Sequence, residues 1–253
     1  MARAILYDLP RQVNLPLPPR NSRLPCIGRR MWVHWRLLKF GHWRRGNALE
    51  VVCLDLEGVL VPEFWIGFAE RTGIAELRAT TRDIPDYDVL MRQRLRILAE
   101  HKLGLKDIQE VIAGMAPMPG AREFIDWARE RFQVVILSDT FYEFSQPLMR
   151  QLGFPTLFCH RLITDDKGMV VDYKLRQKDP KRQCVKAFHE LNYRVLAAGD
   201  SYNDTTMLSE ADVGVLFRAP ANVIAEFPQF ASVEEYDDLR REFIKGSPRD
   251  LTL

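Results

Sequence analysis

The chain has 253 residues, enough for one large domain or for a core with a small accessory domain. Its 47% hydrophobic and 28% charged residues are ordinary for a globular protein with its own core. No stretch approaches the roughly 18 apolar residues of a membrane-spanning helix, no signal-peptide pattern opens the chain, and its four cysteines lack the spacing of a zinc site or a disulfide framework. We therefore expect a cytoplasmic protein with reduced thiols.

Residues 1–49 differ in composition from the rest. They contain ten arginines and lysines against one acid, so the net charge of +2 divides into +9 here and −7 for the remainder. Five prolines interrupt any regular element, and we expect a basic, poorly ordered N-terminal arm. Residues 31–45 are compatible with a short basic helix that contacts a membrane or RNA. A solvated tail is the simpler interpretation, and we expect neither nucleic acid nor membrane as a partner.

Four short apolar runs have the pattern of buried parallel strands that end in polar loops. Helical patterns lie between them, and in one of these Asp179 is the expected N-cap and Pro180 the first helical residue. Strands that alternate with helices predict an α/β fold with a doubly wound parallel sheet. The runs are residues 51–58, 131–139, 193–201 and 211–217, and the helices are residues 121–131 and 180–191.

Residues 62–118 interrupt this alternation because they contain helical patterns, including 87–100 and 105–113, and no convincing strand. An insertion after the first strand lies above the carboxyl ends of the strands, where an open α/β sheet binds ligands. We predict a small helical cap that excludes water and selects the substrate. The expected organisation is an arm at 1–49, an α/β core at 50–61 and 119–253, and a cap at 62–118.

The residues that follow the first strand are suited to phosphoryl transfer. Asp55 and Glu57 stand two positions apart, so both carboxylates can reach one site while Leu56 turns away. One carboxylate can attack phosphorus and the other can protonate the leaving oxygen. Alone, such a sequence is more often an ordinary turn, so its meaning depends on the motifs that follow.

Two further strand ends supply complementary groups. Ser138 offers a hydroxyl, together with loop amides, to a phosphate oxygen. Asp200 and Asp204 follow the third strand, and clustered carboxylates suit a hard cation such as Mg²⁺, which would neutralise the phosphate. Asn203 either contacts the substrate or only shapes its turn, and the sequence leaves both open.

A lysine near the start of the helix at 180–191 is the candidate phosphate ligand. Lys181 stands at the second helical position, four residues before the apolar Val185, and so points with the helix N-terminus toward the strand ends. Lys178 is the alternative, and the sequence does not decide between them.

In this order, the motifs resemble the haloacid dehalogenase superfamily over residues 50–253. The resemblance implies that Asp55 forms an aspartyl-phosphate, that Glu57 is the general acid and base, and that Ser138 and Lys181 hold the phosphoryl oxygens. It also implies a Mg²⁺ site whose ligands are Asp55, the backbone carbonyl of Glu57, Asp200 and, through water, Asp204.

The helical cap resembles that of phosphoserine phosphatases, with agreement in the runs 61–63, 94–98 and 119–123. By that resemblance Glu63 contacts the substrate ammonium and Arg94 its carboxylate, which an arginine can bind with two hydrogen bonds. The implied activity is hydrolysis of O-phospho-L-serine, a small-molecule substrate.

Two positions depart from the usual family pattern. Glu57 replaces a second aspartate, and Asp139 with Thr140 replaces a pair of glycines, which puts bulk and charge beside the phosphate. Both departures lie in runs that resemble a bacterial branch of bifunctional phosphoserine phosphatases, which also transfer the phosphoryl group to homoserine. That resemblance implies a transferase activity and a place in serine and threonine biosynthesis.

Two alternatives stay open. The substrate could be another small phosphomonoester, or the chain could be a non-catalytic binding module on the same scaffold. Such a module would be expected to lose at least one functional residue, whereas Asp55, Glu57, Lys181, Asp200 and Asp204 are all present. The sequence leaves the oligomeric state undetermined.

Overall fold

The computed structural model describes residues 49–80, 83–84 and 86–252. All of them belong to one compact unit of the chain, His42–Leu253. The predicted arm at 1–49 lies, except for Leu49, outside the described residues.

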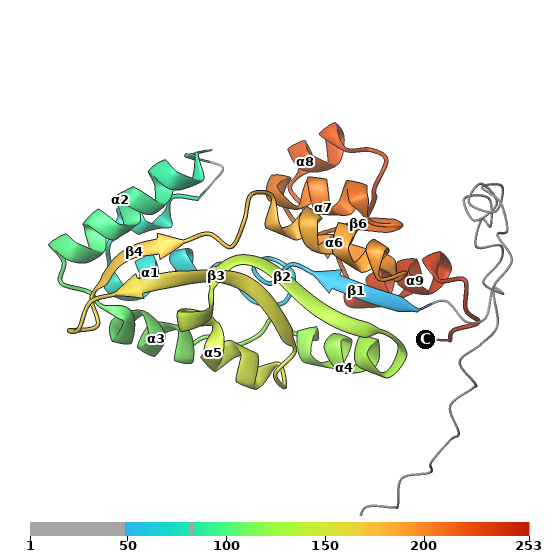
Figure 1. Cartoon of the computed structure of the whole chain (residues 1–253), viewed down its shortest axis with the longest axis horizontal. Coiled ribbons are helices and arrows are strands. Elements are labelled where there is room, and N and C mark those ends of the chain that lie inside the picture. The colour runs from blue at the N-terminus through green and yellow to red at the C-terminus, as the bar shows by residue number, and fades with distance from the viewer. Residues whose placement is uncertain (1–48, 81–82, 85, 253) are drawn as a thin grey trace, which may run out of the picture. The chain divides into compact units, whose positions relative to one another are not determined.

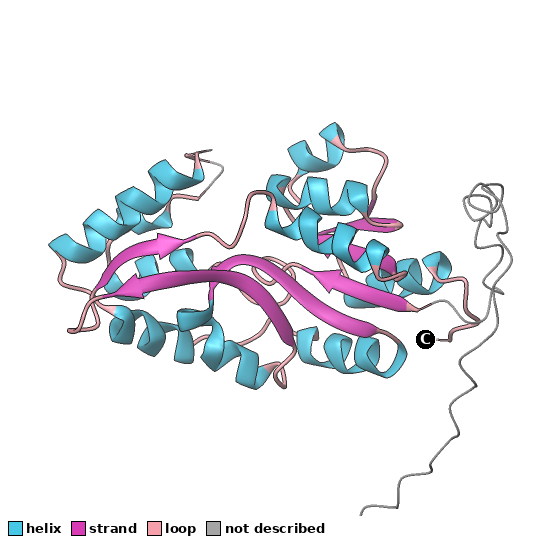
Figure 2. Ribbon diagram, in the orientation of Figure 1, coloured by secondary structure: helices cyan, strands magenta, loops and turns pink. Residues whose placement is uncertain are grey.

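A seven-stranded sheet with the order β4-β3-β2-β1-β5-β6-β7 forms the centre of the fold (Figures 1 and 2). Neighbouring strands are parallel, except that β3 and β4 form an antiparallel hairpin. The strands are β1 Glu50–Leu54, β2 Gln133–Phe141, β3 Thr156–Thr164, β4 Val170–Lys174, β5 Arg194–Gly199, β6 Val213–Phe217 and β7 Ala231–Val233.

The central strand β1 shows why both faces of the sheet are covered. Val52 and Leu54 belong to a hydrophobic cluster that includes side chains of α4, α5 and α9. Val51 and Cys53 belong to a second cluster with side chains of α6, α7 and α8. Because successive side chains of a strand point to opposite faces, each face of β1 carries its own core. The predicted doubly wound α/β fold is confirmed.

Helices α4 (Ala121–Arg131) and α6 (Pro180–Glu190) agree with the predicted segments. Asp179 is the N-cap residue of α6, as predicted, although its φ is 49° and its side chain makes no capping hydrogen bond. Its Oδ1 instead accepts a hydrogen bond from Thr206 Oγ1 at 2.8 Å. The other elements here are α5 Tyr142–Gln151, η2 Tyr202–Asp204, α7 Thr205–Glu210, α8 Ala221–Glu226 and α9 Tyr236–Gly246.

The hairpin of β3 and β4 and the short strand β7 were not predicted. β4 lies at the edge of the sheet, and Asp172 and Lys174 interrupt its apolar residues, so it has no long apolar run. Exposed Ile163 and Val171 further weaken the pattern expected of a buried strand. The hairpin nevertheless matters for the site, because it brings His160 of β3 to the cavity.

The described residues between 62 and 118 form helices, as predicted, and contain no strand. The elements are α1 Phe64–Thr72, η1 Ala75–Arg78, α2 Tyr87–Glu100 and α3 Leu105–Ala113. Figure 1 shows α1, α2 and α3 gathered near β4, at the opposite end of the sheet from α9. Their side chains share the hydrophobic cluster on one face of the sheet. The division into a cap and a core stays a prediction. In the described part of the chain, no helix meets the length and hydropathy of a membrane span.

Candidate active site

A cavity of about 740 Å³ opens at the carboxyl ends of β1, β2 and β5. Strand ends and α6 form one side of it, and helices α1 and α2 with their flanking residues form the other. Open α/β sheets bind ligands at this place, and the volume is typical of a small-molecule pocket. The predicted site residues on its walls are Asp55, Glu57, Glu63, Arg94, Ser138, Asp139, Lys181, Asp200 and Asn203.

Asp55 stands directly after β1 and is only 4% exposed. Its backbone N–H donates to the carbonyl of Ala198 at 3.0 Å, which extends the pairing of β1 with β5 to the edge of the cavity. Its Oδ1 accepts a hydrogen bond from the N–H of Leu56 at 2.8 Å and lies 3.0 Å from Nζ of Lys181. The carboxylate is therefore held in one orientation at the cavity wall.

Two glycines allow the acidic side chains to approach the backbone. Gly58 has a φ of 76°, and a Cβ there would lie 2.4 Å from Cγ of Asp200. A Cβ at Gly199 would lie 2.3 Å from Cγ of Asp204. Any larger residue at these positions would displace a carboxylate. The glycines in the two motifs are thus required by the packing of the acids.

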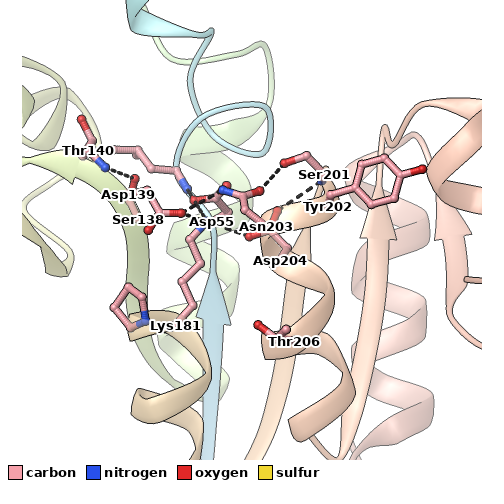
Figure 3. A network of polar contacts seen from close by, with 12 residues as sticks. Asp55, Ser138, Asp139, Thr140, Lys181, Ser201, Tyr202, Asn203, Asp204 and Thr206 are labelled. Atoms are coloured by element: carbon pink, nitrogen blue, oxygen red, sulfur yellow. Dashed lines mark hydrogen bonds and ion pairs between the residues drawn. The ribbon is translucent and has the colours of Figure 1, made fainter. Parts of the chain in front are cut away.

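Lys181 lies at the centre of the acidic groups, with 2% of its side chain exposed. Its Nζ contacts Asp204 Oδ1 at 2.7 Å, Asp55 Oδ1 at 3.0 Å and Asp139 Oδ2 at 3.5 Å. Figure 3 shows these side chains converging from separate elements. Although burial acts to lower it, the three carboxylates raise the pKa of Lys181 well above its usual range. Lys178 lines the same cavity.

Asp55, Asp200 and Asp204 form a group that could hold a metal ion. One oxygen of each lies within 4.8 Å of the others, and all three residues are buried. Burial, and then the nearby Asp204, raise the pKa of Asp55 well above its usual range, despite the contact with Lys181. Three buried carboxyl groups thus face a single ammonium group, and a further cation would favour their ionised forms. A hard divalent cation that prefers oxygen ligands fits this geometry and this set of carboxyl groups.

Glu57 lines the same cavity, and its side chain reaches the start of α1. Its Oε2 accepts a hydrogen bond from the N–H of Phe64 at 2.9 Å. Burial, reinforced by the neighbouring Glu63, raises the pKa of Glu57 to about 8. A carboxyl group with this pKa retains its proton near neutral pH and can donate it to a leaving group.

The helical wall presents a buried arginine. Arg94 of α2 is 7% exposed, and its Nη2 donates to the carbonyl of Ala79 at 2.9 Å. Its guanidinium lies 4.5 Å from the ring centre of Trp65, which also lines the cavity. The buried Nε of Arg94 has no hydrogen-bond partner among the described residues. Burial lowers the pKa of Arg94 to about 10, so it remains charged at neutral pH.

Ser138 and Asn203 have partners within the protein. Ser138 is 3% exposed, and its Oγ accepts a hydrogen bond from the N–H of Thr140 at 3.2 Å. Asn203 donates from Nδ2 to Asp139 Oδ2 at 2.9 Å and accepts a hydrogen bond from Ser201. Asn203 was predicted either to contact the substrate or to shape its turn, and these two hydrogen bonds support the second role.

Two residues of the site were missed from the sequence. Tyr87 of α2 donates from its hydroxyl to the carbonyl of Asp139 at 3.0 Å and so connects the helical wall to β2. His160 of β3 is 3% exposed, and its Nε2 lies 3.4 Å from Asp139 Oδ1. Neither stands in a motif, since both reach the site only through the tertiary fold.

A comparison with known protein families shows to which family the chain belongs. Residues 49–212 match the model of the haloacid dehalogenase-like hydrolases. The chain belongs to this family.

Close relatives share most of the chain. It is 74% identical over 205 residues to phosphoserine phosphatase ThrH of Pseudomonas aeruginosa, covering 81% of this chain and 100% of the relative. It is 73% identical over 206 residues to a phosphoserine phosphatase of Pseudomonas syringae pv. tomato, covering 81% and 87%. Among solved structures, the phosphoserine phosphatase of T. onnurineus in complex with NDSB-201 is similar at 26% identity and a TM-score of 0.60, covering 78% of this chain and 95% of that one.

Proposed function

We propose that the chain is a Mg²⁺-dependent phosphatase that hydrolyses O-phospho-L-serine through an aspartyl-phosphate on Asp55. The observation that carries this proposal is the contact of Asp55 with the buried Lys181 in a cavity at the strand ends. The two Pseudomonas relatives, named as phosphoserine phosphatases, support the choice of substrate.

In the first half-reaction, a carboxylate oxygen of Asp55 attacks phosphorus, and the bond from phosphorus to the serine oxygen breaks. Glu57, protonated because of its raised pKa, gives its proton to the leaving serine oxygen. Lys181 and the hydroxyl of Ser138 bind phosphoryl oxygens and balance their charge. Serine is released and Asp55 carries the phosphoryl group.

In the second half-reaction, the ionised Glu57 takes a proton from a water molecule, whose oxygen attacks phosphorus. The bond from phosphorus to Asp55 breaks, so that inorganic phosphate forms and the carboxylate is regenerated. A Mg²⁺ ion held by Asp55, Asp200 and the backbone at Glu57, with support from Asp204, would neutralise the phosphoryl charge.

The helical wall selects the rest of the substrate. Arg94, which stays charged and has an unpartnered buried Nε, would bind the serine carboxylate. Glu63 lines the same cavity and would bind the ammonium group. A zwitterion with a phosphate at one end matches a cavity that has lysine at one end and an acid and an arginine at the other.

We further propose that homoserine can replace water as the acceptor. Its hydroxyl would give its proton to Glu57 while its oxygen attacks phosphorus, and phosphohomoserine would leave. Homoserine is also an amino acid, so the groups that bind serine can bind it. This second activity requires the same aspartyl-phosphate and no further catalytic group.

The test is phosphate release from L-phosphoserine with Mg²⁺, run in parallel with EDTA and with added homoserine. We expect release that EDTA abolishes and that homoserine partly diverts to phosphohomoserine. Release unaffected by homoserine would contradict only the transferase activity. Absence of phosphoserine turnover, with turnover of other phosphomonoesters, would contradict the proposed substrate.

A further inference from the structure

Asp139 differs from the other carboxylates that contact Lys181. Its contact is the longest, at 3.5 Å, against 2.7 Å for Asp204 and 3.0 Å for Asp55. Its side chain is 28% exposed in the cavity, whereas those of Asp204 and Asp55 are 0% and 6% exposed. An ammonium group has three N–H donors, and three carboxylates contact this one. A phosphoryl oxygen that binds Lys181 therefore competes with these carboxylates for the ammonium group.

The carboxylate of Asp139 has other partners that hold it when it is displaced. Its Oδ2 accepts the hydrogen bond from Asn203, and its Oδ1 lies 3.4 Å from Nε2 of His160. The backbone N–H of Arg176 donates to Nδ1 of His160 at 3.1 Å, so the ring N–H lies on Nε2, the nitrogen that faces Asp139. Asp139 is thus placed between Lys181 on one side and His160 with Asn203 on the other.

This carboxylate stays charged. Although burial acts to raise it, Lys181 and the hydrogen bonds from His160 and Asn203 hold the pKa of Asp139 well below its usual range. A fixed negative charge in the cavity wall repels an anion bound to the same lysine. This repulsion affects inorganic phosphate more than phosphoserine, because inorganic phosphate has no ammonium or carboxylate group that could bind to the helical wall.

We propose that Asp139 competes with the phosphoryl group for Lys181 and thereby weakens the binding of inorganic phosphate, and that His160 sets the strength of this competition by drawing the carboxylate away from the lysine. Asp139 is then an affinity-determining residue that favours product release. This inference rests on the proposed function, since it takes Lys181 to be the phosphate ligand.

The test is calorimetric titration of the Mg²⁺-loaded protein with inorganic phosphate. Asp139→Asn is expected to bind phosphate about tenfold more tightly than the wild type, because the amide keeps the shape and removes the charge. His160→Leu is expected to bind phosphate more weakly, because the carboxylate is then free to move to Lys181. Structural damage would weaken binding in both variants, so the opposite signs are diagnostic.

Two controls complete the design. His160→Gln retains a donor toward Asp139 and is expected to bind phosphate like the wild type. Asp166→Asn, an exposed residue in the turn between β3 and β4, should also leave binding unchanged. Unchanged or weaker binding by Asp139→Asn overturns the inference while phosphoserine turnover by the wild type stands. A wild type that neither binds phosphate nor turns over phosphoserine overturns the proposed function and this inference with it.

Discussion

The two sides of the cavity differ in how their charged side chains are held. On the core side, Asp55, Lys181 and Asp204 are buried ion pairs fixed by strand ends and by glycines that admit no side chain. On the helical side, the guanidinium of Arg94 packs on Trp65 and donates to a backbone carbonyl, and its buried Nε has no hydrogen-bond partner among the described residues. We propose from this difference that the core side determines the chemistry and the helical side determines the substrate. Substitutions on the two sides of the cavity should therefore affect kcat and KM differently.

Asp55→Asn should have the largest effect, a loss of at least about 10⁴-fold in kcat for phosphoserine, because the nucleophile is removed. The metal-free variant should unfold at the same temperature as the metal-free wild type or a higher one. The raised pKa of Asp55 means that its ionised form is disfavoured in the fold, and the amide removes that charge. Kinetic assays and thermal unfolding measure both effects. Retained turnover would refute the assignment of the nucleophile.

Glu57→Gln should reduce kcat for phosphoserine by about 10²- to 10³-fold, because the leaving serine oxygen needs a proton. With p-nitrophenyl phosphate, whose leaving group needs none, the first half-reaction should survive and the second should stall. Stopped-flow absorbance should then show a burst of one nitrophenol per enzyme. Equal losses for both substrates, without a burst, would mean that Glu57 is not the acid.

Arg94→Lys should raise KM for phosphoserine by about 10- to 100-fold with a smaller change in kcat, because a charge-assisted pair of hydrogen bonds to the carboxylate is lost. Phosphoethanolamine, which lacks the carboxylate, should show no such change. The matched control is Arg96→Lys on the same helix, where 70% of the side chain is exposed. A KM effect of equal size on both substrates would contradict carboxylate recognition.

Glu57 also predicts a dependence of stability on pH in the metal-free protein. Its pKa is about 8 in the fold against a usual value of 4.5, so the folded state retains a proton that the unfolded state releases. This contribution to the free energy of unfolding is complete below pH 4.5 and is lost as pH rises toward about 8. Urea unfolding across this range should show a shallower decline for Glu57→Gln. Parallel pH profiles for the two proteins would argue against a raised pKa.

Tyr87→Phe should have the smallest effect. It removes one hydrogen bond to the carbonyl of Asp139, worth about 0.5–1.5 kcal/mol of unfolding free energy. Tyr142→Phe is the control, because its hydroxyl makes a comparable bond to the carbonyl of Leu157. Urea unfolding should show similar losses for both variants, whereas only Tyr87→Phe should change KM, since of these two tyrosines only Tyr87 lines the cavity. A KM for Tyr87→Phe identical to that of the wild type would mean that this hydrogen bond does not affect substrate binding.

The sequence predicted the core side of the cavity better than its surroundings. Asp55, Asp200 and Lys181 follow buried strands or begin a helix, so local pattern was enough to bring them together. His160 could not be found in this way, because its strand belongs to a hairpin of mixed polarity at the edge of the sheet. Tyr87 was missed for a related reason, since a helix pattern does not tell which residue will face a distant loop. Asp179 shows that a correctly predicted N-cap position does not tell which group the side chain binds, since its carboxylate accepts a hydrogen bond from Thr206 instead of capping the helix.

The central claim is that Asp55 carries the phosphoryl group, and the most direct measurement is to trap it. The protein with Mg²⁺ is mixed with phosphoserine, quenched in acid within a turnover and reduced with borohydride, which converts an acyl phosphate to an alcohol. Peptide mass spectrometry should then find the reduced side chain at Asp55, only when phosphoserine was present. Modification at another residue, or none during a measured burst of serine, would contradict the account.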